Sequence, residues 1–260
     1  KYELSANLST LRNRVTSLGF GTDSYISGAY ITNVGQEIGQ FYGWAYEGIA
    51  RTQEDLGNHA TQEGAQIGDC LYKDISGPDG KPDGKVDAND QVVLGSGMPK
   101  IHFGLNARFE YKRFDLSIAT FGALNYHVSD DIYNSLNSCY GWGNKEVGML
   151  DANRFSEDGS TYLSNVPRTY VTNSASLGWN DLFSSRKIQN AAYWKIANVE
   201  LGYNFPNEWF GKYVSDVRFY VSAQNLHTFT GYHGYNVDYA GGTFTPGYNF
   251  CSYPTARTFM

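Results

Sequence analysis

The feature that most constrains this chain is the alternation of apolar and polar side chains over long stretches. In 103–111, aromatic and aliphatic residues occupy every second position, and the residues between them are polar or glycine. The same pattern returns at 114–118, 193–205 and 217–224, with Lys195 interrupting one apolar set. A period of two is that of a β-strand, whose successive side chains point to opposite faces. No long segment has a helical period, so the chain is predicted to be all-β.

The predicted strands are long. They run to about 10–15 residues, whereas a globular strand has about 5–6 and a membrane-spanning strand needs about 9–11. Each has an apolar face with aromatic ends and a polar, partly charged face, which is typical of a transmembrane barrel. A large soluble β-sandwich is the alternative, because its strands also alternate. Strand length and the inward charges favour an antiparallel transmembrane β-barrel segment.

Connections of two lengths alternate between the predicted strands. The turns at 112–113 and 206–215 are short, whereas 51–99, 125–189 and 230–253 are long. The expected strands end near 50 or occupy 100–112, 113–124, 190–205, 216–229 and 254–260. Outer-membrane barrels place short turns on the periplasmic side and long loops outside. The parity therefore predicts three long extracellular loops and a final strand that runs inward.

Composition excludes several other classes. The 260 residues carry a net charge of −6, which argues against a nucleic-acid binder, and they contain no apolar run long enough for a transmembrane helix. The aromatic content of 16% argues against disorder.

The three cysteines have no metal-binding spacing, and isolated, partly buried thiols are favoured over a Cys139–Cys251 disulfide. No signal peptide is visible, and both ends lie in apparent strands, as expected for part of a longer protein.

Several segments match family motifs in order and spacing. They read GQEIGQFYGW with EGI at 35–49, GD, YKD, DGKVD and ND at 68–90, G and PKIHFGL at 95–105, AYWKIANVELGYNFP at 192–206, and NLHTFTGY at 225–232. Together they resemble the SusC/RagA family of TonB-dependent outer-membrane transporters of Bacteroidota, over most of the chain from about residue 35. Two departures stand out: Trp194-Lys195 replaces the usual Leu-Arg, and the family's closing strand is missing after Met260.

The resemblance implies a fold and a setting. Residues 1–260 would form the C-terminal portion of a barrel of about 22 strands around a plugged lumen. This chain would supply about eight strands, and the plug domain and TonB box would lie upstream of it. Because open sheet edges are not viable in lipid, the chain is not expected to be a complete transporter alone. The implied location is the outer membrane, crossed many times.

The resemblance also implies a function and partners. It implies active import of oligosaccharides or peptides, with a SusD-like surface lipoprotein over the extracellular face and energy from the TonB complex. The chain would carry out no reaction. A soluble, aromatic-rich carbohydrate-binding β-sandwich is the alternative, and a glycan-active enzyme is a third hypothesis. No GxSxG, HExxH or phosphate-loop motif supports catalysis.

An Asp-rich stretch suggests a metal site. Counting Asp79 as position 1 places Asp83 at position 5 and Asp90 at position 12 of a calcium loop, with Asp87 between them. Lys81 at position 3 cannot be a ligand, and no helices flank the stretch. A turn in which Asp side chains bind backbone amides is the alternative. The calcium ligands predicted are Asp79, Asp83, Asp87 and Asp90.

Aromatic residues in the long loops are the second candidate site. Tyrosine and tryptophan rings stack on sugar rings or contact peptide, and Tyr adds a hydroxyl group at low entropic cost. The alternatives are loop-to-loop packing and the aromatic girdle at the membrane interface. The ligand-contacting residues predicted are Tyr140, Trp142, Tyr232, Tyr235 and Tyr239.

Overall fold

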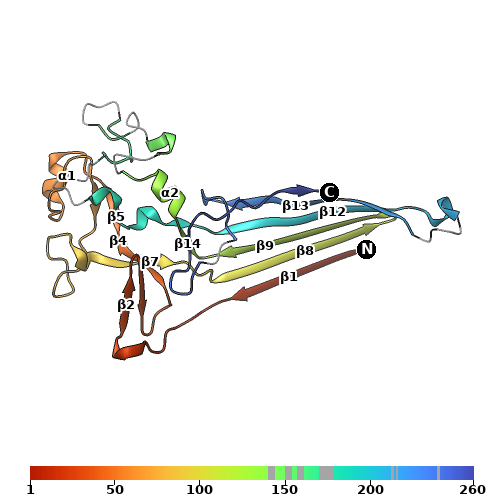
Figure 1. Ribbon diagram of the computed structural model, residues 1–260, viewed down its shortest axis with the longest axis horizontal. Helices are drawn as coiled ribbons and strands as arrows, with labels where there is room; N and C mark the ends of the chain where they lie inside the picture. The colour runs from red at the N-terminus through yellow and green to blue at the C-terminus, as the bar shows by residue number, and fades with distance from the viewer. Residues whose placement is uncertain are drawn as a thin grey trace.

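One antiparallel sheet dominates the fold. The computed structural model describes residues 1–139, 144–149, 154–156, 161–169, 178–211, 214, 216–238 and 241–260. In sheet order, the main strands are β1 (Tyr2–Thr10), β8 (Ile101–Tyr111), β9 (Phe114–Leu124), β12 (Tyr193–Asn204), β13 (Arg218–Thr230) and β15 (Thr258–Phe259). This wall is an open sheet, and its long strands lie side by side in Figure 1. The prediction of an all-β chain with a long-stranded antiparallel sheet is confirmed; the one short parallel pair among the described strands is β10 with β14.

The register of the wall gathers the apolar side chains on one face, here called the apolar face. One row across the strands contains Leu8, Phe103, Gly122, Trp194 and Phe229. A second row contains Tyr111, Phe114, Tyr203 and Phe219. Trp194 stacks on Phe229 in the first row with centroids 5.3 Å apart, and Phe114 contacts Tyr203 in the second at 4.8 Å. The apolar face therefore has aromatic residues at both ends.

Aliphatic side chains lie between these two rows and are open to the surroundings. Leu105, Leu201 and Val221 are 46%, 45% and 49% exposed. The opposite, polar face carries charges that pair with one another: Arg218 Nη2 lies 2.5 Å from Asp115 Oδ2 and 2.7 Å from Glu200 Oε1. A sheet with an uncovered apolar face is not a sandwich, and no second sheet of the described residues covers it.

A β-bulge changes the pattern near one end of β12. The pairing of β12 with both neighbours shifts between Ile196 and Asn198. Ala197 is an extra residue relative to β9, and β13 in turn has one extra residue relative to β12, because Asn225 and Leu226 lie opposite Ala197. Beyond the bulge the faces exchange, and Lys195 and Tyr193 join the polar face. The sequence pattern placed Tyr193 and Ala197 with the apolar set. The placement of Tyr193 is wrong, Ala197 has no register partner in either pairing, and the same bulge explains why Lys195 interrupts that set.

The segments between wall strands form a layer of short elements at one end of the sheet (Figure 1). Its sheets are β2 (Ser24–Ser27), β3 (Tyr30–Asn33), β4 (Gln40–Trp44) and β7 (Gln91–Ser96), then β5 (Tyr46–Ile49) with β6 (Cys70–Tyr72), and β11 (Gln189–Asn190), β10 (His127–Asp130) and β14 (Tyr248–Asn249). The helices are α1 (Gln53–Asn58), α2 (Asp131–Leu136), and the 3-10 turns η1 (Gly19–Gly21), η2 (Ala88–Asp90), η3 (Val147–Met149), η5 (Trp179–Asp181) and η6 (Ser185–Lys187).

The opposite end of the wall has only short connections, including the 3-10 turn η7 (Asn207–Trp209). The predicted segregation of long and short connections is therefore seen. The strand expected to end near residue 50 is wrong, however. The wall strand that precedes β8 in the sequence is β1, and the whole segment 11–100 connects these two strands. The estimate of about eight strands is also too high, since the described wall has six.

Glycines of the first family-like motif allow close approach in the loop layer. A Cβ atom on Gly43 would lie 2.1 Å from the carbonyl oxygen of Phe183. Gly39 has a φ of +63°, and a Cβ there would lie 2.5 Å from Cδ of Pro246. Only glycine fits such positions without displacing backbone. These glycines join β4 to segments far along the chain.

All three cysteines are free thiols. Cys70 and Cys139 are buried, and Cys251 is exposed, so the Cys139–Cys251 disulfide is not formed. Burial raises the pKa of Cys70 to about 12, which keeps this thiol protonated and unreactive. The described residues include no helix with the length and apolar character of a membrane span.

Candidate functional site

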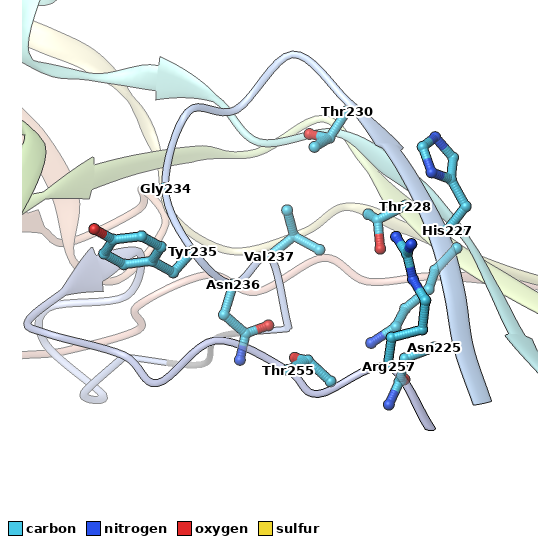
Figure 2. Close-up of a pocket in the computed structure, with 11 residues that line it drawn as sticks. Asn225, His227, Thr228, Thr230, Gly234, Tyr235, Asn236, Val237, Thr255 and Arg257 are labelled. Atoms are coloured by element: carbon cyan, nitrogen blue, oxygen red, sulfur yellow. The ribbon is translucent and has the colours of Figure 1, made fainter. Parts of the chain in front are cut away.

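A cavity of about 370 Å³ lies beside the end of β13 nearest the loop layer (Figure 2). It exists because β15 pairs only with Ala223 and Gln224 of β13. Beyond that point no described strand continues the ladder along this edge of β13. Asn225 has a left-handed φ of +52°, and its side-chain amide donates to the carbonyl of Ala256 at 2.9 Å. The bend at Asn225 separates the two segments and opens the β13 cavity between them.

The walls of the β13 cavity are polar and carry positive charge. Figure 2 shows Arg257 extending toward β13, where Thr228 and Thr230 lie, while the His227 ring points away on the far side of the strand. Arg257 has no ion-pair partner among the described residues. The second cation, Lys195, is only 4% exposed, and its Nζ lies 2.5 Å from Oδ2 of Asp238. The free charge of the cavity is therefore that of Arg257.

The Lys195–Asp238 ion pair fixes the loop that closes the cavity. Lys195 reaches the polar face because of the bulge at Ala197, and its ammonium also lies 5.7 Å from the ring centre of Phe121. Asp238 follows Val237, which lines the β13 cavity and a second cavity of about 490 Å³ on the other side of the loop. The second cavity is flanked by Tyr126 and Tyr193. One ion pair thus holds the partition between two cavities.

Two of the predicted ligand-contacting aromatics are described, and they differ. Tyr235 lines the β13 cavity and is 63% exposed. Tyr232 is 6% exposed, and its hydroxyl donates to the Asp130 carboxylate and accepts from the Asn249 amide. Burial raises the pKa of Tyr232, and the bond to Asp130 raises it further. Tyr232 therefore packs inside the loop layer, whereas the Tyr235 ring is available to a ligand.

The other three predicted aromatics, Tyr140, Trp142 and Tyr239, lie outside the described residues. A ligand contact for them, as for Tyr235, stays a prediction. A third concave surface, of about 450 Å³, combines Gln189 and Asn190 with a stacked Tyr133–His233 pair. Both residues belong to the aromatic-rich loops identified from the sequence, but neither is among the five predicted ligand-contacting residues.

The Asp-rich stretch folds into a turn held by its own carboxylates. Buried Asp90 accepts from the amides of Ile75, Ser76 and Asp87 at 2.7, 3.0 and 2.7 Å. Asp83 accepts from the amide of Lys85 at 3.0 Å, and Asp87 accepts from the amide of Asn89 at 2.7 Å. These bonds are those of the alternative prediction, a turn in which carboxylates satisfy backbone donors.

Calcium binding at Asp79, Asp83, Asp87 and Asp90 stays a prediction. Among the described residues, no three or more His, Cys, Asp or Glu side chains are grouped as metal ligands. Asp79 is exposed on the turn. An ion there would have to compete with backbone amides for the oxygens of Asp83, Asp87 and Asp90.

Comparison with curated proteins adds to this geometry. The chain is 29% identical to TonB-dependent receptor P3 of Formosa agariphila, with 97% of this chain and 25% of that protein aligned. It is 24% identical to TonB-dependent receptor SusC of Bacteroides thetaiotaomicron, over 100% of this chain and 24% of SusC. No family model matches the chain. The chain spans about a quarter of the length of these relatives.

Comparison with solved structures supports the same fold. A chain from the structure of the RagAB peptide transporter superposes with a TM-score of 0.77 at 22% identity, over 99% of this chain and 26% of that one. The chain is SusC/RagA-like. The open sheet described above thus has the fold of part of a RagA-like barrel, which confirms the barrel prediction. These relatives are named as receptors and transporters, not as enzymes.

Sequence reasoning missed the residues that shape the β13 cavity. Arg257 lies in the last short segment, where no alternation marks it. Asn225 belongs to a family-like motif, but its left-handed conformation is not visible in the motif. The one available signal was Lys195, whose interruption of an apolar set in a SusC/RagA-like strand marks the bulge and hence the buried ion pair with Asp238.

Proposed function

We propose that the protein containing this chain imports oligosaccharides or peptides across the outer membrane. In this proposal the wall strands form part of the barrel and the loop layer forms part of its extracellular end. The observation that carries the proposal is the apolar face of the wall. It is uncovered, has aromatic rows at both ends and lies opposite a polar face. In water such a face would be an aggregation surface, whereas in a bilayer it faces lipid.

The dimensions of the apolar face support a membrane position. The two aromatic rows meet β8 at Phe103 and Tyr111, which are about 27 Å apart along the strand at about 3.4 Å per residue. An outer-membrane barrel has an apolar band about 25 Å tall. β8 and β9 have 11 residues each, and β12 and β13 have 12 and 13. These lengths suit tilted strands that cross a bilayer.

The relatives support a transport system with partners. RagAB is named as a peptide transporter, and SusC as a TonB-dependent receptor. By this likeness, the proposed partners are a SusD-like lipoprotein on the extracellular face and the TonB complex, which would act on a part of the protein outside this chain. The β13 cavity offers an arginine, threonine hydroxyls and the Tyr235 ring, which can bind sugar hydroxyls or peptide groups.

The test is uptake by cells that express the full-length protein or its Tyr235→Ala variant in place of the deleted native copy. Fluorescein-labelled neutral oligosaccharides and peptides of mixed sequence serve as probes. We expect the protein to sediment with outer membranes and Tyr235→Ala to lower the uptake of one probe class. Tyr253→Ala is the control, because Tyr253 is 88% exposed and lies outside the cavity. Recovery of the protein in solution without detergent would contradict the proposal.

A further inference from the structure

Two arginines continue the apolar face of the wall beyond its end. Even-numbered residues of β1 lie on that face: Leu4 and Leu8 are 62% and 70% exposed. Pairing with β8 continues one residue past β1, because the amide of Leu11 donates to the carbonyl of Lys100 at 2.9 Å. Leu11 lines the cavity that contains Tyr193, on the polar side. Alternation then places Arg12 on the same side as Leu8.

Asn13 fixes the next step of this alternation. Its Oδ1 accepts from the amide of Ile38 at 3.0 Å, and its Nδ2 lies 3.0 Å from Sδ of Met98. Asn13 is therefore tied to the loop layer, and Arg14 follows Arg12 on the outer side. The Arg14 guanidinium lies against Gly35, where a Cβ atom would be 3.5 Å from Nη2. Gly35 has a φ of +86°, a conformation that residues with a side chain rarely adopt, so no side chain stands between Arg14 and the backbone here.

Both arginines are unpaired. Neither has an ion pair or a side-chain hydrogen bond among the described residues. The carboxylate beside them, Glu37, lies 2.8 Å from Nζ of Lys100 and is neutralised by it. Together with Gly35 and Gln36, the arginines and Glu37 line an open cavity of about 520 Å³, here called the rim cavity. Asn13 completes the lining. The rim cavity thus carries two unpaired arginines and one carboxylate, that of Glu37, whose Oε1 is paired with Lys100 and whose Oε2 has no hydrogen-bond partner among the described residues.

The rim cavity lies where the apolar face ends. Leu8 belongs to the row that contains Trp194 and Phe229, the aromatic row at the loop end of the wall. Arg12 follows Leu8 by four residues, or about 13 Å in an extended chain. That is the level at which a lipid headgroup begins if the apolar face lies in acyl chains. Arginine side chains at such a boundary direct their charge to the headgroups.

We propose that Arg12 and Arg14 bind the phosphate of a lipid headgroup in the outer leaflet. The guanidinium group suits this ligand because it forms paired hydrogen bonds with phosphate oxygens. The inference rests on the membrane position given under the proposed function. It assigns to the rim cavity a lipid site whose lining residues are all different from those of the β13 cavity.

The test measures lipid binding to the full-length protein in a neutral detergent by native mass spectrometry. Phosphatidylglycerol is the anionic probe, and phosphatidylcholine, whose phosphate carries its own cation, is the comparison. We expect Arg12→Gln and Arg14→Gln each to weaken phosphatidylglycerol binding about fivefold. The double variant should weaken it by more than tenfold and leave phosphatidylcholine binding unchanged. Arg108→Gln is the matched control, since it removes one arginine from the polar face.

Four outcomes would overturn the inference. One is phosphatidylglycerol binding that does not change in the double variant, and another is equal binding of both lipids by the unaltered protein. A third is millimolar inorganic phosphate displacing the lipid at the rim, which would indicate a site for free anions. The fourth is loss of a co-purifying lipoprotein, but not of lipid, in the double variant. Retained heat-resistant migration on gels shows that each variant is folded. A protein that needs no detergent would instead contradict the proposed function.

Discussion

The wall and the loop layer of this chain are stabilised in different ways. In the wall, each side chain contacts its register partners on one face, and most apolar side chains remain exposed. In the loop layer, aromatic side chains are buried in compact clusters. One contains Tyr72 and Trp179, and another contains Tyr126 and Tyr232. The cluster around Tyr72 is a core of the loop layer alone, and the cluster around Tyr126 extends to Ala123 and Tyr193 at the loop end of the wall. The rest of the wall depends on what lies against its apolar face.

Buried polar groups show the same contrast. In the loop layer, Asp69 is 1% exposed and receives two bonds from Arg168, at 2.6 and 2.8 Å, and one from Asn180 at 2.8 Å. In the wall, Arg108 Nη2 lies 3.2 Å from Glu110 Oε1, and these side chains are 61% and 38% exposed. Losing a buried partner is costly, whereas losing a solvated one costs little. The loop layer is therefore stabilised by specific bonds between residues far apart in the sequence. The wall is instead specified by the alternation of apolar and polar residues along each strand.

The largest effect is expected from Arg168→Met in the loop layer. This change leaves the Asp69 carboxylate buried without its cation, which should cost about 3–5 kcal/mol. Hydrogen exchange of the loop layer, measured on the full-length protein, should rise while exchange in β8 and β9 stays slow. The double variant Asp69→Asn/Arg168→Met should recover part of the loss. Equal loosening of wall and loops would show that the two regions are not separate.

A charge on the apolar face tests the wall. Ala107→Arg places a cation in the middle of the apolar face, halfway between Phe103 and Tyr111, and should lower the free energy of unfolding in lipid vesicles by about 2–4 kcal/mol. Asn106→Arg, one residue along on the polar face, is the control and should change it by less than about 1 kcal/mol. Denaturant titration in vesicles measures both variants. Similar losses would contradict the assignment of the two faces.

Gly43→Ala tests the close contact between β4 and the segment before β11. The new methyl group would meet the carbonyl oxygen of Phe183, which is backbone and cannot rotate away. Overpacking of this kind costs about 1–3 kcal/mol. Limited proteolysis should show earlier cleavage in the loop layer. Gly48→Ala is the control, because a Cβ there has no atom within 4 Å.

The smallest effect is expected at the start of α1. Thr52 and Asp55 form a capping box, in which the Asp55 side chain accepts from the amides of Arg51 and Thr52. These bonds, with that of Arg51 first, lower the pKa of the Asp55 carboxyl group. A lowered pKa means that the cap stabilises the fold above the ordinary aspartate pKa and is lost as the pH falls through the lowered value.

Hydrogen exchange in α1 should therefore quicken on acidification, by an amount equivalent to less than about 1 kcal/mol, because Asp55 is exposed to solvent. Asp55→Asn should remove this pH dependence while leaving exchange in β8 unchanged. An unaltered acid response in the variant would mean that another group controls α1.

The wall could be predicted from the sequence because its physics is local. The alternation at 103–111 specifies which side chains share a face, and the two-residue turn at 112–113 specifies the next pairing. The prediction failed at Ala197, because one inserted residue exchanges the faces without altering composition. It also failed near residue 50, where β4 and β5 alternate but are too short for the wall and pair within the loop layer.

The loop layer could not be predicted in this way. Asp69 and Arg168 are 99 residues apart, and nothing in either neighbourhood indicates the partner. The family-like motifs marked Gly39, Gly43 and Asp90 without giving the reason. The structure supplies it: the glycines admit neighbouring backbone, and Asp90 binds three backbone amides. Among the predicted ligand-contacting aromatics, Tyr235 is exposed and Tyr232 is buried, and this difference is visible only in the folded structure.

The pairing of β1 with β8 has a consequence for the order of assembly. β8 and β9 are joined by a two-residue turn, so their hairpin closes a short loop. Leu8 finds Phe103 only after the whole segment between them has been made, and contacts at such sequence separation form slowly. The hairpin is therefore expected to be an early folding unit, with β1 joining late. In a membrane, the segment between β1 and β8 would have to cross the bilayer before these two strands pair. Its export would then be a step in the folding of the wall.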